Sequence, residues 1–184
     1  MEGAHYKASG ELVRLSEQQL VDCCRGEDYD CYGCEGGFMK PAFNYTGKNG
    51  ICKEDDYKYT ARDETCKQDS CTPVTKVTSY ESVEPGNREA MQEANNVEPV
   101  SVAVDASFWQ FYGGGIFDCP FNFGLNHGVL LVGYDFTSTN EEDHWIVRNS
   151  WGAGWGENGD IRLNAKSSAA ACLMLEDAAL AHTD

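Results

Sequence analysis

Two neighbouring stretches decide the fold, 125-LNHGVLLVGYD-135 and 144-HWIVRNSWGAGWGENGDIR-162. Each contains an apolar run bounded by Asn, Asp or Gly, which is typical of a buried strand. His127 lies at the start of the first run, and Asn149 follows the second. A neutral asparagine amide can hold an imidazole in one tautomer, which suits a thiolate–imidazolium pair whose nucleophile is already ionised. The pattern therefore predicts that His127 and Asn149 support a catalytic thiol.

Composition excludes several classes of protein. The chain has 184 residues, enough for one globular unit built from two small lobes, with 30 acidic against 14 basic residues and a formal charge of −16. The negative electrostatic field of this charge repels a phosphate backbone, so we expect no nucleic-acid partner. No run approaches the ~18 apolar residues of a membrane span, and residues 1–5 carry no basic or apolar signal segment. We therefore expect no membrane partner.

The order of elements predicts an α+β protein with segregated lobes. The first half favours helices: residues 1–8 are stopped by Ser9 and Gly10, and Ser16 stands three residues before Gln19, a capping-box spacing. A third helix is expected over residues 38–50, with Gly47 and Gly50 at its end. After Pro73 the chain favours strands, and we expect the boundary near residues 75–80. The expected strands are 74–83, 99–106, 127–136, 144–150 and 159–165, with one helix in 84–96 that has Glu84 and Pro85 at its start.

Nine cysteines in a chain of this length indicate an oxidising compartment. Because the count is odd, one thiol is free or lacks its partner here. Cys31 and Cys34 form a C-x-x-C pair, so a zinc site is the rival interpretation. A structural zinc site needs a second pair with similar spacing, and the sequence has none. We therefore expect no metal.

The quoted stretches, together with "LSEQQLVDC", "GCEGGFM", "YTARDETCK" and "PVSVAVDASFWQFYGGGIF", occur in the order found in the papain-like cysteine peptidases. The chain resembles this family, in particular its cathepsin L-like members, from Met1 to about residue 177. The resemblance implies a papain-like α+β fold. Residues 1–78 would form a helical, disulfide-rich left lobe that lacks its N-terminal part. Residues 79–184 would form a β-barrel-like right lobe that is packed on it and carries His127 and Asn149.

By the same resemblance the chain is a cysteine-type endopeptidase with a Cys-His-Asn mechanism, in which His127 is the general base and Asn149 orients it. The family's nucleophile lies in a C-G-S-C-W type stretch roughly 130–150 residues before the histidine. That position falls about ten residues before Met1, and the oxyanion-hole glutamine would lie earlier still. We therefore expect a truncated chain that is inactive alone. Two alternatives stay open: a non-catalytic homologue that binds peptides or proteins, and a thiol hydrolase that uses Cys23 or Cys24.

The family's framework also implies the disulfide pairs. It pairs Cys23 with Cys66 and Cys119 with Cys172. Cys52 and Cys71 resemble an extra bridge of some protozoan members, and Cys24 and Cys31 would remain to pair with each other. Cys34 would be the unpaired thiol, because its usual partner lies just before the nucleophile.

The resemblance further implies a substrate groove. Gly36 and Gly37 would offer backbone hydrogen bonds to an extended peptide, although the pair also reads simply as a turn. Trp151 would cover the hydrogen bond between asparagine and histidine. Asp177 at the base of the S2 pocket would allow a basic substrate side chain as well as Leu or Phe, and the alternative is an exposed acid. The S2 pocket would be lined by Phe38, Met39, Ala103, Leu125 and Gly128, with Asp177 below them.

The implied partners are peptide or protein substrates, the protein's own propeptide and cystatin-like inhibitors. We expect a monomer without cofactors, located in the lysosome or vacuole or secreted. Asn44 heads an Asn-Tyr-Thr glycosylation sequon within an expected helix, so its occupancy is left open.

Overall fold

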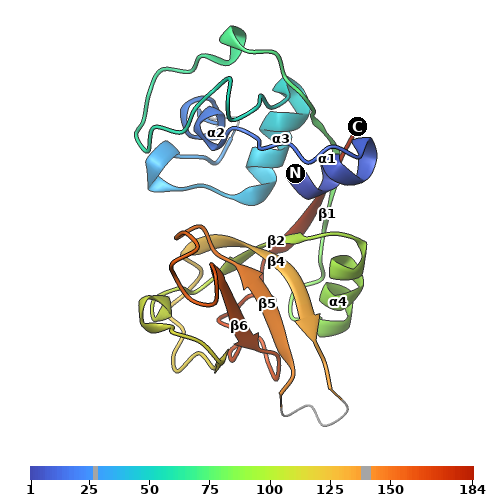
Figure 1. Cartoon of the computed structure of the whole chain (residues 1–184), viewed down its shortest axis with the longest axis vertical. Coiled ribbons are helices and arrows are strands. Elements are labelled where there is room, and N and C mark those ends of the chain that lie inside the picture. The colour runs from blue at the N-terminus through green and yellow to red at the C-terminus, as the bar shows by residue number, and fades with distance from the viewer. Residues whose placement is uncertain (27–28, 138–141) are drawn as a thin grey trace. The chain divides into compact units, whose positions relative to one another are not determined.

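The computed structural model describes residues 1–26, 29–137 and 142–184 (Figure 1). The chain forms two compact units: Met1–Glu81 with Ala181–Asp184, and Ser82–Leu180. Two strands, β1 (Val77–Ser82) and β7 (Ala178–Thr183), contain residues of both units. The division therefore differs from the expected boundary between residues 78 and 79. Residues 181–184 belong to the first unit, so β7 has its first three residues in the second unit and its last three in the first.

Three α-helices form in the first unit where the sequence predicts them: α1 (Glu2–Ser9), α2 (Glu17–Cys23) and α3 (Met39–Asn49). Gly10 ends α1 in the left-handed conformation, and the Ser16 hydroxyl accepts the Gln19 N–H at 3.0 Å to cap α2. The third helix ends at Gly50, whereas Gly47 lies inside it. A Cβ at Gly47 would lie 2.9 Å from the Val77 carbonyl, so this glycine permits a close backbone approach. Two short 3₁₀ helices, η1 (Gly33–Glu35) and η2 (Gln68–Ser70), complete the unit.

Buried polar side chains of α2 hold the long irregular segment between α3 and β1. Gln19 donates to the Gly50 carbonyl at 3.1 Å and accepts from the Cys52 N–H at 2.8 Å. Asp22 accepts the Tyr57 hydroxyl at 2.7 Å. Burial, with this hydrogen bond, raises the pKa of Tyr57 to about 12. Because these groups satisfy backbone N–H and C=O groups of the segment, it needs no regular secondary structure.

The second unit is built on an antiparallel sheet in which β2 (Val100–Val104), β4 (His127–Asp135), β5 (His144–Arg148) and β6 (Asp160–Asn164) are successive neighbours (Figure 1). The full strand order is β1-β7-β2-β4-β5-β6-β3. The last strand, β3 (Ile116–Phe117), pairs parallel with β6. A 3₁₀ helix, η3 (Trp109–Phe111), follows β2.

Alternating residues of these strands form the core of the second unit. In β2 the valines at 100, 102 and 104 are fully buried while Ser101 and Ala103 are partly exposed. The helix α4 (Arg88–Val97) contributes Met91, which is fully buried. Asn95 of this helix donates to the Leu131 carbonyl of β4 at 3.2 Å. The same core includes Leu131, Trp145, Ile161, Leu163 and Met174.

The structure differs from the expected elements at one helix, at one strand and in two further strands. The helix α4 begins at Arg88 and not at Glu84–Pro85, because the Asn87 side chain caps it by accepting the Ala90 N–H at 2.9 Å. The residues before Asn87 form a turn, and the Gly86 N–H donates to the Leu175 carbonyl. The strand β1 is shorter than expected, spanning Val77–Ser82. The strands β3 and β7 were not predicted, since β3 has two residues and β7 has the alanine-rich sequence AALAHT.

The predicted α+β class is confirmed. The structure contains four disulfides, Cys23–Cys66, Cys24–Cys31, Cys52–Cys71 and Cys119–Cys172. These are the pairs that the resemblance implies, and Cys34 is a free, exposed thiol. Among the described residues, no helix combines the length and apolar character that a membrane crossing requires.

Candidate active site

Two adjacent strands bring His127 and Asn149 together. His127 is the first residue of β4 and pairs with Val104 of β2, while Asn149 directly follows the last residue of β5. Because β4 and β5 are antiparallel neighbours, the start of one lies beside the end of the other. The His127 Nε2 atom lies 2.8 Å from the Asn149 Oδ1 atom, although the residues are 22 positions apart. This contact forms a hydrogen bond in the second unit.

The surrounding backbone fixes the tautomer of the imidazole. The Ser150 N–H donates to Asn149 Oδ1 at 2.8 Å, so this amide atom is the oxygen and acts as an acceptor. His127 Nε2 must therefore carry the proton and donate it to Asn149. A neutral His127 consequently presents the lone pair of Nδ1, and no described residue hydrogen-bonds to that nitrogen. The buried Nδ2 of Asn149 also has no hydrogen-bond partner within the described part of the chain.

Two tryptophan rings contact the histidine, and a third tryptophan packs against both of them. The ring of Trp151 lies 5.4 Å from the His127 ring, and the buried Trp109 meets it edge-on at 6.1 Å. Trp155 stacks on Trp109 at 5.9 Å and contacts Trp151 at 5.2 Å. Aromatic rings at this range stabilise a cation and exclude water from a neighbouring hydrogen bond. Sequence reasoning assigned a cover only to Trp151 and missed Trp109, whose sole signal was its place in a family-like segment.

Four of the proposed S2 residues, Ala103, Leu125, Gly128 and Asp177, lie in the second unit. Ala103 of β2 pairs with Gly128 of β4, and the Ala103 N–H donates to the Asp177 carbonyl at 2.9 Å. Leu125 is 42% exposed and stands two residues before the histidine. These residues therefore border the same end of the β2–β4 pair as His127.

The other predicted groove residues are contiguous in the first unit, between η1 and the first turn of α3. Gly36 has φ of 103°, a conformation that favours glycine, and its carbonyl accepts the Tyr32 N–H at 2.8 Å. Gly37 forms an isolated bridge with Cys31. Phe38 is the N-cap residue of α3 and is 54% exposed, and Met39 opens the helix.

Eight of the nine cysteines are oxidised in disulfides, and Cys34 is the free thiol. Cys23 and Cys24 are both oxidised in disulfides, which removes the alternative of a hydrolase that uses either of them. Local desolvation and the neighbouring Asp63 carboxylate raise the pKa of the Cys34 thiol, the opposite of the shift that activates a cysteine nucleophile. Because Cys31 is bonded to Cys24, the rival zinc interpretation also loses a ligand. Within residues 1–26, 29–137 and 142–184, no three His, Cys, Asp or Glu side chains gather as metal ligands do.

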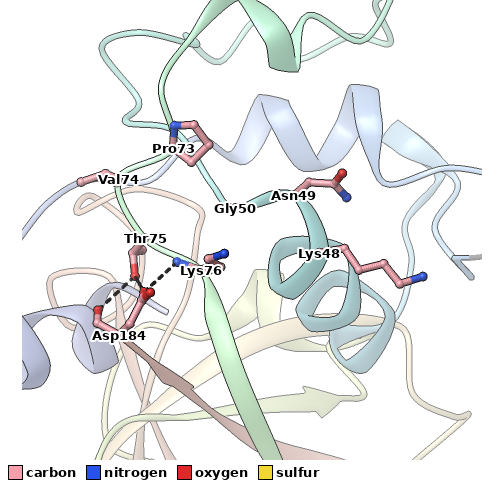
Figure 2. Close-up of a pocket in the computed structure, with 8 residues that line it drawn as sticks. All are labelled: Lys48, Asn49, Gly50, Pro73, Val74, Thr75, Lys76 and Asp184. Carbon is pink, nitrogen blue, oxygen red and sulfur yellow. Dashed lines mark hydrogen bonds between the residues drawn. The ribbon is translucent and has the colours of Figure 1, made fainter.

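A separate hollow lies in the first unit (Figure 2). The Asp184 carboxylate accepts from the Thr75 hydroxyl and the Lys76 N–H, both at 3.3 Å. The Lys76 N–H holds the pKa of Asp184 below its usual value. The lining contains neither His nor Cys and therefore offers no thiol or imidazole chemistry. It consists of Lys48, Asn49, Gly50, Pro73, Val74, Thr75, Lys76 and Asp184.

Comparisons with known proteins show the family to which the chain belongs. The sequence model of the papain family cysteine proteases matches residues 1–182 of the chain. Human cathepsin L2 is 44% identical over 172 residues, which cover 89% of this chain and 51% of that protein. Zingipain-2 of Zingiber officinale is 42% identical over 165 residues, 88% of this chain and 72% of that protein.

Solved structures give the same result. Digestive procathepsin L 3 of Tenebrio molitor matches with a TM-score of 0.89 and 38% identity, covering 98% of this chain and 59% of that one. Bromelain of Ananas comosus, in complex with the inhibitor E64, matches with a TM-score of 0.87 and 37% identity, covering 98% and 83%. The chain belongs to the papain family of cysteine proteases and has its papain-like α+β fold. It spans about half the length of several curated relatives, including cathepsin L2.

Proposed function

We propose that this chain carries the histidine and asparagine of a cysteine-type endopeptidase that hydrolyses peptide bonds by a Cys-His-Asn mechanism. His127 Nδ1 accepts the thiol proton and later returns it to the leaving amine. Asn149 Oδ1 holds Nε2–H, so that the imidazolium forms in the required orientation. The single observation that carries the proposal is the 2.8 Å hydrogen bond between His127 and Asn149. The Ser150 N–H identifies Asn149 Oδ1 as its acceptor.

The nucleophile of the proposed reaction is not among the nine cysteines of this sequence. Eight of them are in disulfides, and desolvation with the neighbouring Asp63 carboxylate raises the pKa of the Cys34 thiol, which opposes formation of a thiolate. Since the thiolate is the attacking species, these 184 residues alone form no acyl-enzyme. No C-G-S-C-W type stretch occurs in the 184 residues, so the proposed mechanism requires a thiol and an oxyanion-hole glutamine in addition to them.

The proposed substrates are peptides and proteins bound in an extended conformation. In the first unit, Gly36 and Gly37 would bind the peptide main chain. In the second unit, Ala103, Leu125 and Gly128 would bind a Leu or Phe side chain. The related Amb a 11 cysteine protease of ragweed pollen has been solved in its proform, so a propeptide is a proposed intramolecular partner of this chain. Cystatin-like inhibitors are proposed external partners. Four disulfides are typical of an oxidising compartment, which favours a lysosomal, vacuolar or secreted protein.

A chimera tests the function. A segment of a close relative that carries the C-G-S-C-W stretch and the preceding glutamine is fused before Glu2, and a fluorogenic Phe- or Leu-containing peptide is the substrate. We expect turnover by the chimera, its loss on treatment with an epoxide inhibitor, and none from the unfused chain. His127→Ala should abolish turnover, and Asn149→Ala should lower kcat by about 10-fold to 100-fold.

Two controls make this test decisive. Changing the grafted cysteine to serine should abolish turnover while leaving the fold intact by circular dichroism. The first cysteine of the grafted stretch is the expected disulfide partner of Cys34, so Cys34→Ser should lower the stability of the chimera while leaving the nucleophile in place. A folded chimera that binds a cystatin-like inhibitor but never turns over substrate would instead support a non-catalytic, peptide-binding protein.

Asp177 is proposed to admit an Arg side chain to S2 when its carboxylate is ionised. Arg and Leu substrates are compared on the active chimera and on its Asp177→Asn variant. We expect the ratio of kcat/KM for Arg over Leu to fall by about tenfold or more in the variant, because a charge-assisted contact is lost. An unchanged ratio would show that Asp177 does not face the substrate.

A further inference from the structure

The segment that leads into His127 has no regular secondary structure. Residues 118–126 form neither helix nor strand, and His127 is the first residue of the β4 ladder. The early part of the segment is tied by the Cys119–Cys172 disulfide and by the Asn122 side chain, which donates to the Ala169 carbonyl at 3.0 Å. The backbone between Phe123 and Asn126 has to be held in another way if the catalytic ring is to keep its place.

A single buried carboxylate holds this stretch. Asp105 directly follows β2 and is 1% exposed. Its Oδ2 accepts the N–H groups of Phe123 and Gly124, and its Oδ1 accepts the Asn126 side-chain amide at 3.0 Å. Oδ1 also accepts the Ser107 N–H at 3.0 Å and the Ser107 hydroxyl. Five donors therefore converge on one carboxylate from two chain segments.

The contacts continue from Asp105 to His127 along the backbone. The Asn126 N–H donates to the Val104 carbonyl at 2.9 Å, and Val104 is the β2 partner of His127. The Asn126 Oδ1 accepts the Ala106 N–H at 2.9 Å, so Asn126 is held on both sides. The Asp105 N–H donates to the carbonyl of Cys172 at 2.8 Å. A buried charge with these partners fixes the geometry of every group that it binds.

We propose that Asp105 is a positioning residue for the histidine: its carboxylate holds residues 123–126 so that the His127 ring stays aligned with Asn149. The inference rests on the proposed function for its catalytic consequence, but its structural part concerns this chain alone. Burial acts to raise the pKa of Asp105, yet the hydrogen bonds from Ser107, Phe123 and Asn126 lower it to about 2. The carboxylate thus remains ionised, and keeps all five acceptor contacts, in mildly acidic surroundings.

Asp105→Asn is the sharpest test because the shape is kept while one acceptor atom becomes a donor. Both carboxylate oxygens face only donors, so either orientation of the new amide places an NH₂ group against an N–H group. Hydrogen exchange of the Phe123 and Gly124 amides is measured on the full chain by NMR. We expect exchange at both to accelerate by about tenfold or more, and the His127 Nε2–H resonance to broaden or disappear.

Asp143→Asn is the matched control. Asp143 is also a buried carboxylate of the second unit, 2% exposed, and it binds the Arg88 side chain and the Thr137 N–H. It contacts neither residues 123–126 nor His127, so its variant should leave both NMR signals unchanged even if it lowers stability. Should Asp105→Asn fail to fold, Ser107→Ala removes one donor from the partly exposed end of the cluster, and we expect a smaller acceleration at the same two amides.

A catalytic readout separates this inference from the proposed function. In the active chimera, Asp105→Asn should lower kcat by about 10-fold while KM changes less than about threefold, because the ring is displaced but the substrate groove is not. If the wild-type chimera is inactive, the proposed function fails, and the exchange data still decide the role of Asp105. Unchanged exchange at Phe123 and Gly124 and an unchanged His127 resonance in a folded Asp105→Asn or Ser107→Ala chain would overturn the inference.

Discussion

At the scale of single residues, the site depends on groups that add no charge next to the histidine. Asn149 binds Nε2–H through a neutral oxygen, and the Ser150 N–H prevents the amide from turning over. A carboxylate in this place would stabilise the imidazolium without the thiolate, whereas the amide leaves that task to the thiolate itself. The sequence predicted that His127 and Asn149 act together. Which of the two donates the hydrogen bond follows only from the Ser150 N–H contact in the structure.

Gly156 gives a prediction at the same scale. It has φ of 54°, and a Cβ there would lie 2.5 Å from the Asp160 carbonyl and 3.2 Å from the Tyr112 ring. We expect Gly156→Ala to lower the free energy of unfolding by about 2–4 kcal/mol, since it combines backbone strain with a steric clash. All four tryptophans lie in the second unit, so tryptophan fluorescence in urea measures the effect there.

Gly154 is the matched control, because nothing lies within 4 Å of a Cβ built there and its φ is not positive. Gly154→Ala should change the free energy of unfolding by less than about 0.5 kcal/mol. Equal effects of the two substitutions would contradict the steric explanation.

At the scale of elements, helix ends follow their capping groups. Ser16 and Gly10 mark the limits of their helices both in the sequence and in the structure. At α4 the sequence misled, because Glu84 and Pro85 are typical of a first turn, yet Asn87 makes the cap. The two start signals lie within four residues of each other, and the left-handed conformation of Gly86, with φ of 73°, excludes the earlier start.

Asn87→Ala tests the helix boundary. Losing the side-chain contact to the Ala90 N–H should lower the free energy of unfolding by about 0.5–2 kcal/mol. Asn87→Ser, which keeps a capping oxygen, should recover most of that loss in the same urea titration. Were Glu84 the effective cap, Glu84→Ala would be the more damaging change and Asn87→Ala would be close to neutral.

At the scale of the whole molecule, carboxylates with lowered pKa values determine how the stability of the fold responds to acid. Hydrogen bonds from Arg162 lower the pKa of Glu157 to about 2, and Asp105 has a similar value. The Arg88 side chain lowers the pKa of Asp143. A group whose pKa is lower in the folded state stabilises the fold above its ordinary value and loses this effect as the pH falls through the folded value. Glu17 has the opposite sign, because burial and the neighbouring Glu54 raise its pKa.

We therefore expect the free energy of unfolding to change little between about pH 7 and 5 and to fall between about pH 4 and 2. Asp105 alone should account for about 2 kcal/mol of the loss. Urea titrations at a series of pH values measure the profile, and Glu157→Gln should make its acid limb shallower. A steep loss of stability already between pH 6 and 5 would show that other groups control the acid response.

The sequence alone determined the features that depend on neighbouring residues: three helices of the first unit with their caps, the strands at 127–136 and 144–150, and the pairing of His127 with Asn149 as a chemical type. Tertiary structure decided what depends on residues far apart in the chain. Trp109 meets the histidine, the alanine-rich segment 178–183 becomes a strand, and Asp105 binds N–H groups 18 and 19 positions away. The physical reason is that periodicity and capping act within a few residues, whereas a buried carboxylate or aromatic ring acquires its role only from the segments that folding brings around it.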